Sequence, residues 1–380
     1  MKRTGVFLFG IATAGAATLE VADDPALRRA LAVAGPGDEI VVKAGVYRGG
    51  LHVKGRSGKR DAPIVLRGER NGDVPVFRGG GSSAIQFSGC SHWRVERLAA
   101  EDFPGNGFNV DDAGRLEAPS RGMLLKGLRS LRTGPRGNHD GIKLSGLAEF
   151  RVEDCEVVGW GGSAIDLVGC RDGVIRGCRL AGAEGFSQQS GIQLKGGTRR
   201  VLVERCRFED AGMRAVNLGG STGKAYFRPR VSEFEAEDIE VRDCVFEGGG
   251  CAVAFVTSRG GRFHHNLVVR PRKWAIRILQ EQPVPEFGSC GDGVFAGNLV
   301  VLPADNRSAV NIGPDTRPES FAFRDNLWFH EGGRHRPRLP VPEAGGRYGV
   351  DPRGPGGSVR APEGFGPRVS DQGEGAGDGG

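Results

Sequence analysis

A short pattern of apolar and variable positions recurs along most of the chain. Each copy places a small residue before an apolar residue, a variable residue and a second apolar residue. In a β-strand the two apolar positions point to one face and the variable position points to the other. The pattern therefore predicts a series of short strands, each burying one face. The copies lie at 84–87, 140–144, 163–167, 190–194, 214–218, 252–255, 275–278 and 309–312.

A second apolar stretch follows each copy, and a cysteine or asparagine then occupies a fixed position. Only 22 residues separate Cys244 from Asn266, so one repeat needs about that length and longer spacings contain loops. Rungs of a parallel solenoid stack ~4.8 Å apart. Stacked asparagines can satisfy one another, and stacked thiols fill space as small apolar groups. The sequence therefore predicts an all-β right-handed parallel β-helix with a ladder at Cys155, Cys178, Cys206, Cys244, Asn266, Asn298 and Asn326.

The two ends of the chain depart from this pattern. Residues 25–31 predict an amphipathic cap helix and residues 40–42 the first strand, because a solenoid needs a plug over its open core. A basic start, an apolar stretch and an A-x-A site predict an export signal, and hence a secreted or periplasmic protein. The expected division is a signal peptide at 1–17, a cap at 18–50, coils at 51–330 with an insertion at 219–238, and a Pro/Gly-rich, partly disordered tail at 331–380.

Composition narrows the class of partner. The chain has 65 glycines in 380 residues, far above the usual ~7%, which suits many tight turns. Its net charge of +6 favours an acidic partner. The charges are scattered and no segment is apolar enough to span a membrane, so we expect no nucleic-acid or membrane partner. We also expect a monomer. The eight cysteines show no metal-binding spacing and are expected as buried free thiols, with a vertical disulfide as the open alternative.

The cap, the segments 45–47 and 62–66, and the laddered repeats together resemble the pectate-lyase-like superfamily of β-helix proteins over roughly residues 20–330. The resemblance implies an acidic polysaccharide as partner, in many members outside the cell. It leaves the activity open, because the superfamily contains lyases, hydrolases, epimerases and proteins without catalysis.

Local resemblances indicate individual residues. The stretch 140–146 is similar to the strand that carries the catalytic lysine of lysine-base pectate lyases, which implies Lys143. Lys195 stands where the chondroitinase B and alginate lyase family has its lysine base. That family's arginine would fall near Gly219, so Arg214 at the start of the same strand is the candidate substitute. The calcium cluster of the pectate lyases has its nearest counterpart in Asp111 and Asp112.

The variable position of the first strand forms an outward column that is most polar in the central repeats. Such a strip would be roughly 15–20 Å long and would hold about four sugar units. The expected substrate-binding residues are Ser190, Gln193, Asn217 and Arg277, together with Tyr226 and Arg228 of the insertion. The full column reads Gln86, Asn109, Lys143, Asp166, Gln193, Asn217, Ala254, Arg277 and Asn311.

A β-eliminating lyase needs a base for the proton next to the uronate carboxylate and a cation for that carboxylate. A lysine serves as base only after losing its proton, and a free lysine has a pKa of about 10.4. A neighbouring arginine or calcium ion would lower such a pKa. The candidates for this chemistry are Lys143, Lys195, Arg214, Asp140, Asp166 and His139.

Three alternatives stay open at this stage. Asp140 and Asp166 could act as the acid and base of a glycoside hydrolase. An epimerase would share the lyase's proton abstraction and differ only in how the proton returns. Lys143 and Asp166 could equally form a plain surface ion pair on a polysaccharide-binding protein without catalysis. The main hypothesis is a lyase acting on a uronate-containing polysaccharide.

Overall fold

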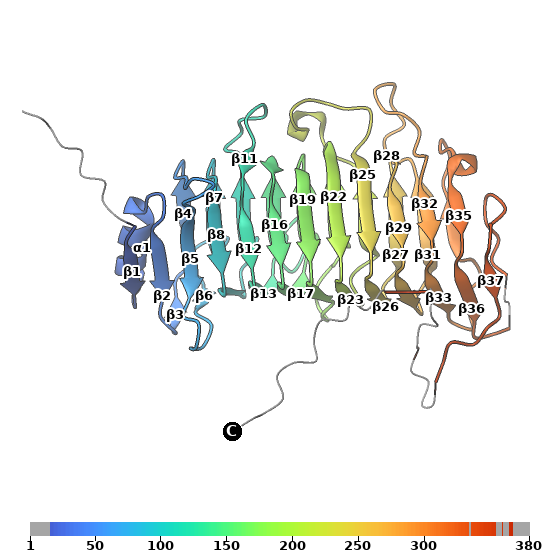
Figure 1. Cartoon of the computed structure of the whole chain (residues 1–380), viewed down its shortest axis with the longest axis horizontal. Coiled ribbons are helices and arrows are strands. Elements are labelled where there is room, and N and C mark those ends of the chain that lie inside the picture. Colours follow the sequence, from blue (N-terminus) through green and yellow to red (C-terminus); the bar gives the residue numbers. More distant parts are fainter. Residues whose placement is uncertain (1–15, 334–335, 355–358, 360–364, 368–380) are drawn as a thin grey trace, which may run out of the picture.

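Three parallel β-sheets run along the long axis of the molecule in the computed structural model, which describes residues 16–333, 336–354, 359 and 365–367. Each coil passes once through each sheet, so successive rungs stack side by side (Figure 1). The fold is the predicted right-handed parallel β-helix. Of the expected signal peptide, residues 1–15 lie outside the described residues.

The ten-stranded sheet, here called sheet 1, carries the repeats from which the sequence pattern was recognised. Its strands are short because each coil must turn twice more before the next rung begins. They are β4 (Leu51–Lys54), β7 (Ile85–Ser88), β10 (Phe108–Asp111), β14 (Ile142–Ser145), β18 (Ser163–Val168), β21 (Ser190–Lys195), β24 (Arg214–Gly219), β27 (Cys251–Val256), β31 (Trp274–Leu279) and β34 (Val310–Ile312).

Sheet 2 has fifteen strands and follows sheet 1 in each coil. Its main strands are β1 (Thr18–Val21), β2 (Glu39–Val42), β5 (Ile64–Gly68), β8 (Trp93–Glu96), β12 (Leu124–Lys126), β16 (Arg151–Glu153), β19 (Arg171–Arg176), β22 (Thr198–Glu204), β25 (Ala236–Arg242), β29 (Arg262–His264), β32 (Val294–Ala296) and β35 (Ala322–Arg324). Three short strands join its edge: β11 (Ser120–Arg121), β15 (Leu147–Ala148) and β28 (Ser258–Arg259).

Sheet 3 has twelve strands and completes each coil. They are β3 (Val46–Tyr47), β6 (Val76–Arg78), β9 (Ala99–Glu101), β13 (Arg129–Thr133), β17 (Glu156–Trp160), β20 (Arg179–Ala181), β23 (Arg207–Glu209), β26 (Val245–Glu247), β30 (Leu267–Val269), β33 (Leu299–Leu302), β36 (Leu327–His330) and β37 (Arg347–Tyr348). Two 3₁₀ turns lie in loops: η1 (Lys224–Tyr226) and η2 (Pro318–Ser320).

The N-terminal cap is one turn longer than expected and is preceded by a strand that the sequence analysis missed. Helix α1 spans Asp24–Val33, and the Asp23 side chain accepts a hydrogen bond from the Ala26 N–H at 2.7 Å. The helix buries Leu27 and Leu31 against the end of the core. Strand β1 pairs in parallel with β2, so the stack begins before residues 40–42.

The predicted ladder is present in the turns between sheets 2 and 3. The Cys244 N–H donates to Asn266 Oδ1 at 3.0 Å, and the Asn266 N–H donates to Asn298 Oδ1 at 2.9 Å. Asn298 in turn donates to Asn326 Oδ1 at 2.9 Å. All eight cysteines are buried free thiols, so the vertical disulfide is not formed.

The stack continues beyond residue 330, where the repeats were expected to give way to an irregular tail. Strand β37 pairs with β36, and Glu343 closes the ladder by accepting a hydrogen bond from the Asn326 N–H at 3.2 Å. The same carboxylate accepts bonds from Trp328 Nε1 and the Tyr348 hydroxyl. Residues 336–354 therefore cover the C-terminal end of the core, and most of the tail beyond residue 354 lies outside the described residues.

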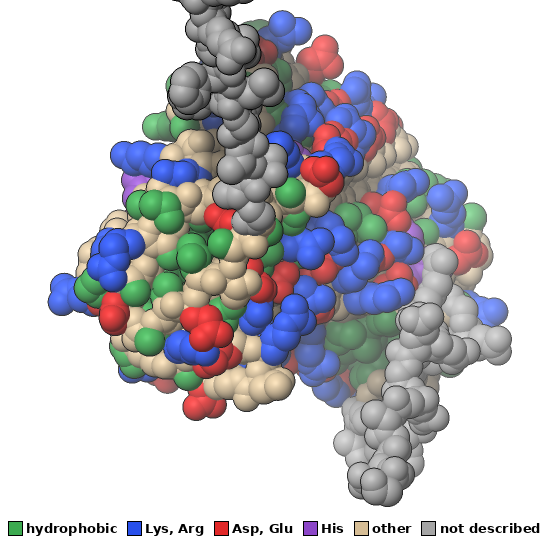
Figure 2. Space-filling model, turned by 60° about the vertical axis from the view of Figure 1, so that its left-hand side comes forward, with side chains coloured by type: hydrophobic (Ala, Val, Ile, Leu, Met, Phe, Trp, Pro, Cys, Tyr) green, Lys and Arg blue, Asp and Glu red, His purple; other side chains and the backbone are tan. Residues whose placement is uncertain are grey.

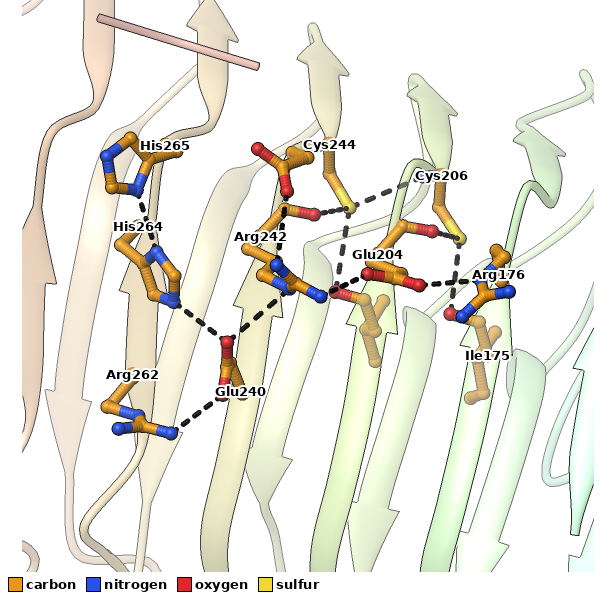
Figure 3. A network of polar contacts seen from close by, with 12 residues as sticks. Ile175, Arg176, Glu204, Cys206, Glu240, Arg242, Cys244, Arg262, His264 and His265 are labelled. Carbon is orange, nitrogen blue, oxygen red and sulfur yellow. Dashed lines mark hydrogen bonds and ion pairs between the residues drawn. The ribbon is translucent and has the colours of Figure 1, made fainter. Parts of the chain in front are cut away.

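The outer face of sheet 2 is covered by cross-strand ion pairs. Glu204 receives Arg176 Nε at 2.5 Å and Arg242 Nη2 at 2.6 Å from the two neighbouring strands (Figure 3). Glu240 receives Arg262 Nη2 at 2.7 Å and contacts His264 Nε2 at 3.1 Å. Lys/Arg and Asp/Glu side chains lie next to one another over part of the visible surface (Figure 2). The ion pairs on sheet 2 therefore compensate charges of both signs. No helix among the described residues is long and apolar enough to cross a membrane.

Candidate functional site

The outward column of sheet 1 has the order read from the sequence. Parallel registers place Asn109 beside Lys143, Lys143 beside Asp166, and Asp166 beside Gln193. The same register continues through Asn217. It then runs through Ala254, Arg277 and Asn311. Because the apolar residues on either side of each position fill the core, these side chains must leave the opposite face of the sheet.

Lys143 and Lys195 meet around the carboxylate of Asp166. Lys143 Nζ lies 2.8 Å from Asp166 Oδ2 and 2.7 Å from Asp140 Oδ2. Lys195 Nζ lies 3.2 Å from Asp166 Oδ1. The resulting group has two cations and two carboxylates and extends over the three neighbouring strands β14, β18 and β21. It is a compact charge-balanced cluster and not an exposed surface ion pair.

The two carboxylates of this cluster are completely buried. Asp140 and Asp166 both have 0% exposed side chains, whereas 20% of Lys143 is exposed. Burial, together with the charge of Asp166, raises the pKa of the Asp140 carboxyl. Burial lowers the pKa of Lys143, but Asp166 and Asp140 raise it by more, so Lys143 is held as a cation. Asp140 Oδ1 also accepts the Ser163 N–H at 2.8 Å, which fixes the carboxylate beneath the surface.

This burial separates the roles that the sequence left open. A hydrolytic acid and base must both reach the glycosidic bond, and neither aspartate is exposed to it. Lys143 is occupied as the cation between them. Lys195 also contacts Asp166, but that is its one carboxylate partner among the described residues, and its side chain lines a groove on the face of sheet 1.

The groove has a volume of about 490 Å³ and lies over strands β21 and β24. Amides and hydroxyls dominate its lining, which suits the hydroxyl groups of a sugar. Three predicted substrate contacts, Ser190, Gln193 and Asn217, are among them. The lining residues are Asn138, Gly162, Gln189, Ser190, Gln193, Lys195, Met213, Arg214, Asn217, Ser221 and Glu281.

Arg214 lies in the same groove as Lys195. Its guanidinium forms an ion pair with Glu281, and its Nη1 donates to Asn217 Oδ1 at 3.4 Å. The position where the resemblance would place an arginine, Gly219, cannot carry a side chain: a Cβ there would lie 1.7 Å from the Val256 carbonyl oxygen. The arginine of this groove is therefore Arg214, at the start of strand β24, and not a residue at position 219, at its end.

The insertion between β24 and β25 forms one wall beside the groove. Glu235 is completely buried and accepts hydrogen bonds from the N–H groups of Thr222 and Gly196 at 2.6 and 2.7 Å. Gly196 directly follows Lys195. The insertion therefore holds in place the turn that follows Lys195 at the end of strand β21.

The predicted calcium ligands do not fit a calcium site. Asp112 is buried and forms an ion pair with Arg228 at 2.9 Å, so a guanidinium already compensates its charge. Asp111 accepts hydrogen bonds from Gln86 Nε2 and Ser88 Oγ at 2.9 and 3.0 Å. Among the described residues no three His, Cys, Asp or Glu side chains gather as metal ligands. We therefore assign no step to calcium.

Three further predicted residues lie apart from the groove. Arg228 is 11% exposed and engaged with Asp112, so it anchors the insertion and does not face a substrate. Tyr226 is 64% exposed in η1. His139 is exposed and is not among the residues that line the groove.

Sequence reasoning missed several residues that the groove or its wall brings in, and four of them carry amide or carboxylate groups. Asn138, Gln189 and Glu281 line the groove, and Glu235 supports its wall. All four belong to loops outside the repeating strands. The sequence offered one signal, which is that Asn138 and Gln189 directly precede the predicted site residues His139 and Ser190.

Comparisons with known proteins agree with this architecture. A family model described as a right handed beta helix region matches residues 134–286. An alginate lyase from Paenibacillus sp. str. FPU-7 is similar in structure, with a TM-score of 0.51 and 20% identity, over 87% of this chain and 98% of the lyase. A rhamnogalacturonan lyase has a TM-score of 0.54 and 15% identity, over 93% and 97%.

An endo-xylogalacturonan hydrolase from Aspergillus tubingensis is also similar, with a TM-score of 0.53 and 14% identity, over 87% of this chain and 100% of the hydrolase. No curated protein sequence matches the chain. At these identities the likeness establishes the fold. The protein is a right-handed parallel β-helix.

Proposed function

We propose that this chain is an exported polysaccharide lyase that cleaves a uronate-containing polymer by β-elimination, with Lys195 as the base. One observation carries the proposal: Lys195 and Arg214 lie together in a groove of amides and hydroxyls, while Asp140 and Asp166 are buried. Glu281 also lines the groove and pairs with Arg214. The similar structures include lyases that are named for acidic polysaccharides, which supports the same substrate class.

The residues divide the reaction as follows. Neutral Lys195 removes the proton on C5 of the uronate, and the electron pair of that C–H bond forms the C4–C5 double bond. The bond from C4 to the glycosidic oxygen breaks, and that oxygen takes a proton from water. The hydroxide that remains takes the proton from Lys195, which restores the neutral amine. Arg214 faces the uronate carboxylate, whose negative charge increases as the proton leaves. Lys143 compensates the charge of Asp166, so Lys195 is not the only cation available to that carboxylate.

The ultraviolet absorbance of the unsaturated uronate product tests the proposal. Purified protein is incubated with pectate, alginate and chondroitin sulfate, and absorbance is followed together with reducing ends. We expect Lys195→Ala to lower the rate by about 10²- to 10⁴-fold, the usual contribution of a positioned base. Lys126→Ala is the matched control, because Lys126 is an exposed lysine on sheet 2 that pairs with Asp154.

Other results would contradict the lyase. Reducing ends without absorbance would indicate a hydrolase. A changed uronate NMR spectrum without cleavage would indicate an epimerase. Binding of a polymer without either change would leave a binding protein, and full activity in Lys195→Ala would show that the base is another residue.

A further inference from the structure

Arg277 is a fixed cation on the face of sheet 1, two rungs beyond Arg214. Its guanidinium lies over the ring of Trp274 at 4.5 Å, and its Nε donates to Asn311 Oδ1 at 2.9 Å. Stacking on one side and a hydrogen bond on the other restrict the guanidinium to one orientation. The remaining N–H groups are free to bind a group above the sheet.

Among the described residues Arg277 has no ion-pair partner of its own, and the nearby carboxylate of Glu281 is paired with Arg214. Within the part of the chain that the structure describes, no Asp or Glu lies within ion-pair distance of it. The arginines on the outer face of sheet 2 provide the contrast, because Arg176, Arg242 and Arg262 all contact carboxylates from neighbouring strands (Figure 3). Burial and the nearby charge of Arg214 both lower the pKa of Arg277. An incoming anion would relieve this unfavourable environment.

The rung between the two arginines is apolar. The outward-facing residues of β27, Cys251, Ala254 and Val256, are completely buried, and Trp274 and Leu279 pack against them. No polar side chain of this rung competes for a ligand. Arg277 is in register with Asn217, to which the Arg214 guanidinium donates. Two rung spacings, ~9.6 Å, separate the strands of Asn217 and Arg277.

This spacing matches the geometry of an extended polysaccharide. One sugar unit of an extended chain advances by about one rung, ~4.8 Å. Alternate units of such a chain present their substituents to the same side. The unit between them would pass over the β27 rung, whose buried side chains offer it no polar partner.

We propose that Arg277 binds a second acidic group of the substrate, two sugar units from the unit whose carboxylate meets Arg214. This inference rests on the proposed function for the placement of the first unit. It defines the substrate class as a polysaccharide with an acidic group on at least every second sugar. Polyuronates meet this requirement, and so do polymers in which every second sugar is a uronate. A polymer with isolated acidic groups does not meet it.

Binding measurements separate this inference from the activity. Calorimetry on the Lys195→Ala background, which cannot cleave, uses hexasaccharides of galacturonate, mannuronate and chondroitin, and a carboxyl-reduced galacturonate hexasaccharide. We expect Arg277→Gln to weaken the best acidic hexasaccharide at least about tenfold, as loss of a charged hydrogen-bond partner does. Arg277→Lys should give an intermediate loss, because it keeps the charge without the planar fork. The reduced hexasaccharide should bind equally to all variants.

Arg259→Gln is the matched control. It removes the same charge, but Arg259 lies on sheet 2 and already pairs with Glu237. If Arg277→Gln and Arg277→Lys bind like Arg259→Gln, or if no acidic hexasaccharide binds better than the reduced one, the inference is overturned. If binding depends on Arg277 but the unmodified protein releases no unsaturated product, the acidic subsite stands and the lyase activity fails.

Discussion

Glu235 accepts a hydrogen bond from the backbone N–H of Gly196 at 2.7 Å, across 39 positions of the chain. The carboxylate is completely buried and also receives the N–H and hydroxyl of Thr222. Three neutral donors thus converge on one anion, which supports the turn after Lys195 without using a cation.

The first prediction follows from this arrangement. Glu235→Gln replaces one acceptor oxygen with an N–H₂ group that would face other donors. We expect the free energy of unfolding to fall by about 1–3 kcal/mol, the penalty of unsatisfied buried donors. Turnover should fall as well, because the turn holding Lys195 loosens. Denaturant unfolding and product absorbance measure the two effects. Glu237→Gln is the control, because Glu237 is only partly buried and pairs with Arg259. Equal stability of the two variants would show that Glu235 does not fix this turn.

A second prediction concerns Lys143. Lys143→Met leaves the buried Asp140 without its cation and leaves Asp166 with Lys195 alone, so we expect a loss of about 3–5 kcal/mol at neutral pH. Burial already raises the pKa of Asp140, and removal of Lys143 raises it further. The folded variant then binds protons that the unfolded chain has released, and its stability decreases as the pH rises above ~4. The difference from the unmodified protein should therefore be smaller at pH 4 than at pH 7. Urea unfolding at both pH values checks this, and a difference independent of pH would contradict it.

A third prediction uses the buried thiols. Burial raises the pKa of Cys170 and of Cys251 to about 12, from an ordinary value of 9.0. Between these values the unfolded chain loses the thiol protons while the folded chain keeps them. Their contribution to stability is therefore complete below pH ~9 and is lost as the pH rises toward 12. Cys170→Ala should flatten the fall in unfolding free energy over this range, and an unchanged slope would refute the assignment. The native thiols should also react slowly with a thiol reagent at pH 8 and fully after unfolding.

The repeating part of the molecule could be predicted because it depends on local rules. A strand alternates its side chains with a period of two, and parallel rungs stack each position on its copy. These rules were enough to align Lys143, Asp166 and Gln193, and to recognise the Asn ladder. Strand β1 escaped prediction because Thr18–Val21 buries little, with only Val21 fully inside.

The loops could not be predicted in the same way. Arg228 reaches Asp112 across 116 positions, and this contact removes both from the roles expected for them. Glu281 reaches Arg214 across 67 positions. The neighbours of a loop residue depend on the path of the whole loop, and no period in the sequence encodes that path.

By itself, the sequence determined the solenoid, its ladder and the polar column on which the site is built, because each is a consequence of strand alternation repeated at a nearly constant length. Only the tertiary structure decided which of those polar residues face a ligand. It buried Asp140 and Asp166 under Lys143, and it left Lys195 and Arg214 in the groove. Within the described part of the chain it left Arg277 without an ion-pair partner. Burial and charge compensation depend on neighbours from several coils and loops together, and these neighbours meet only when the chain is folded.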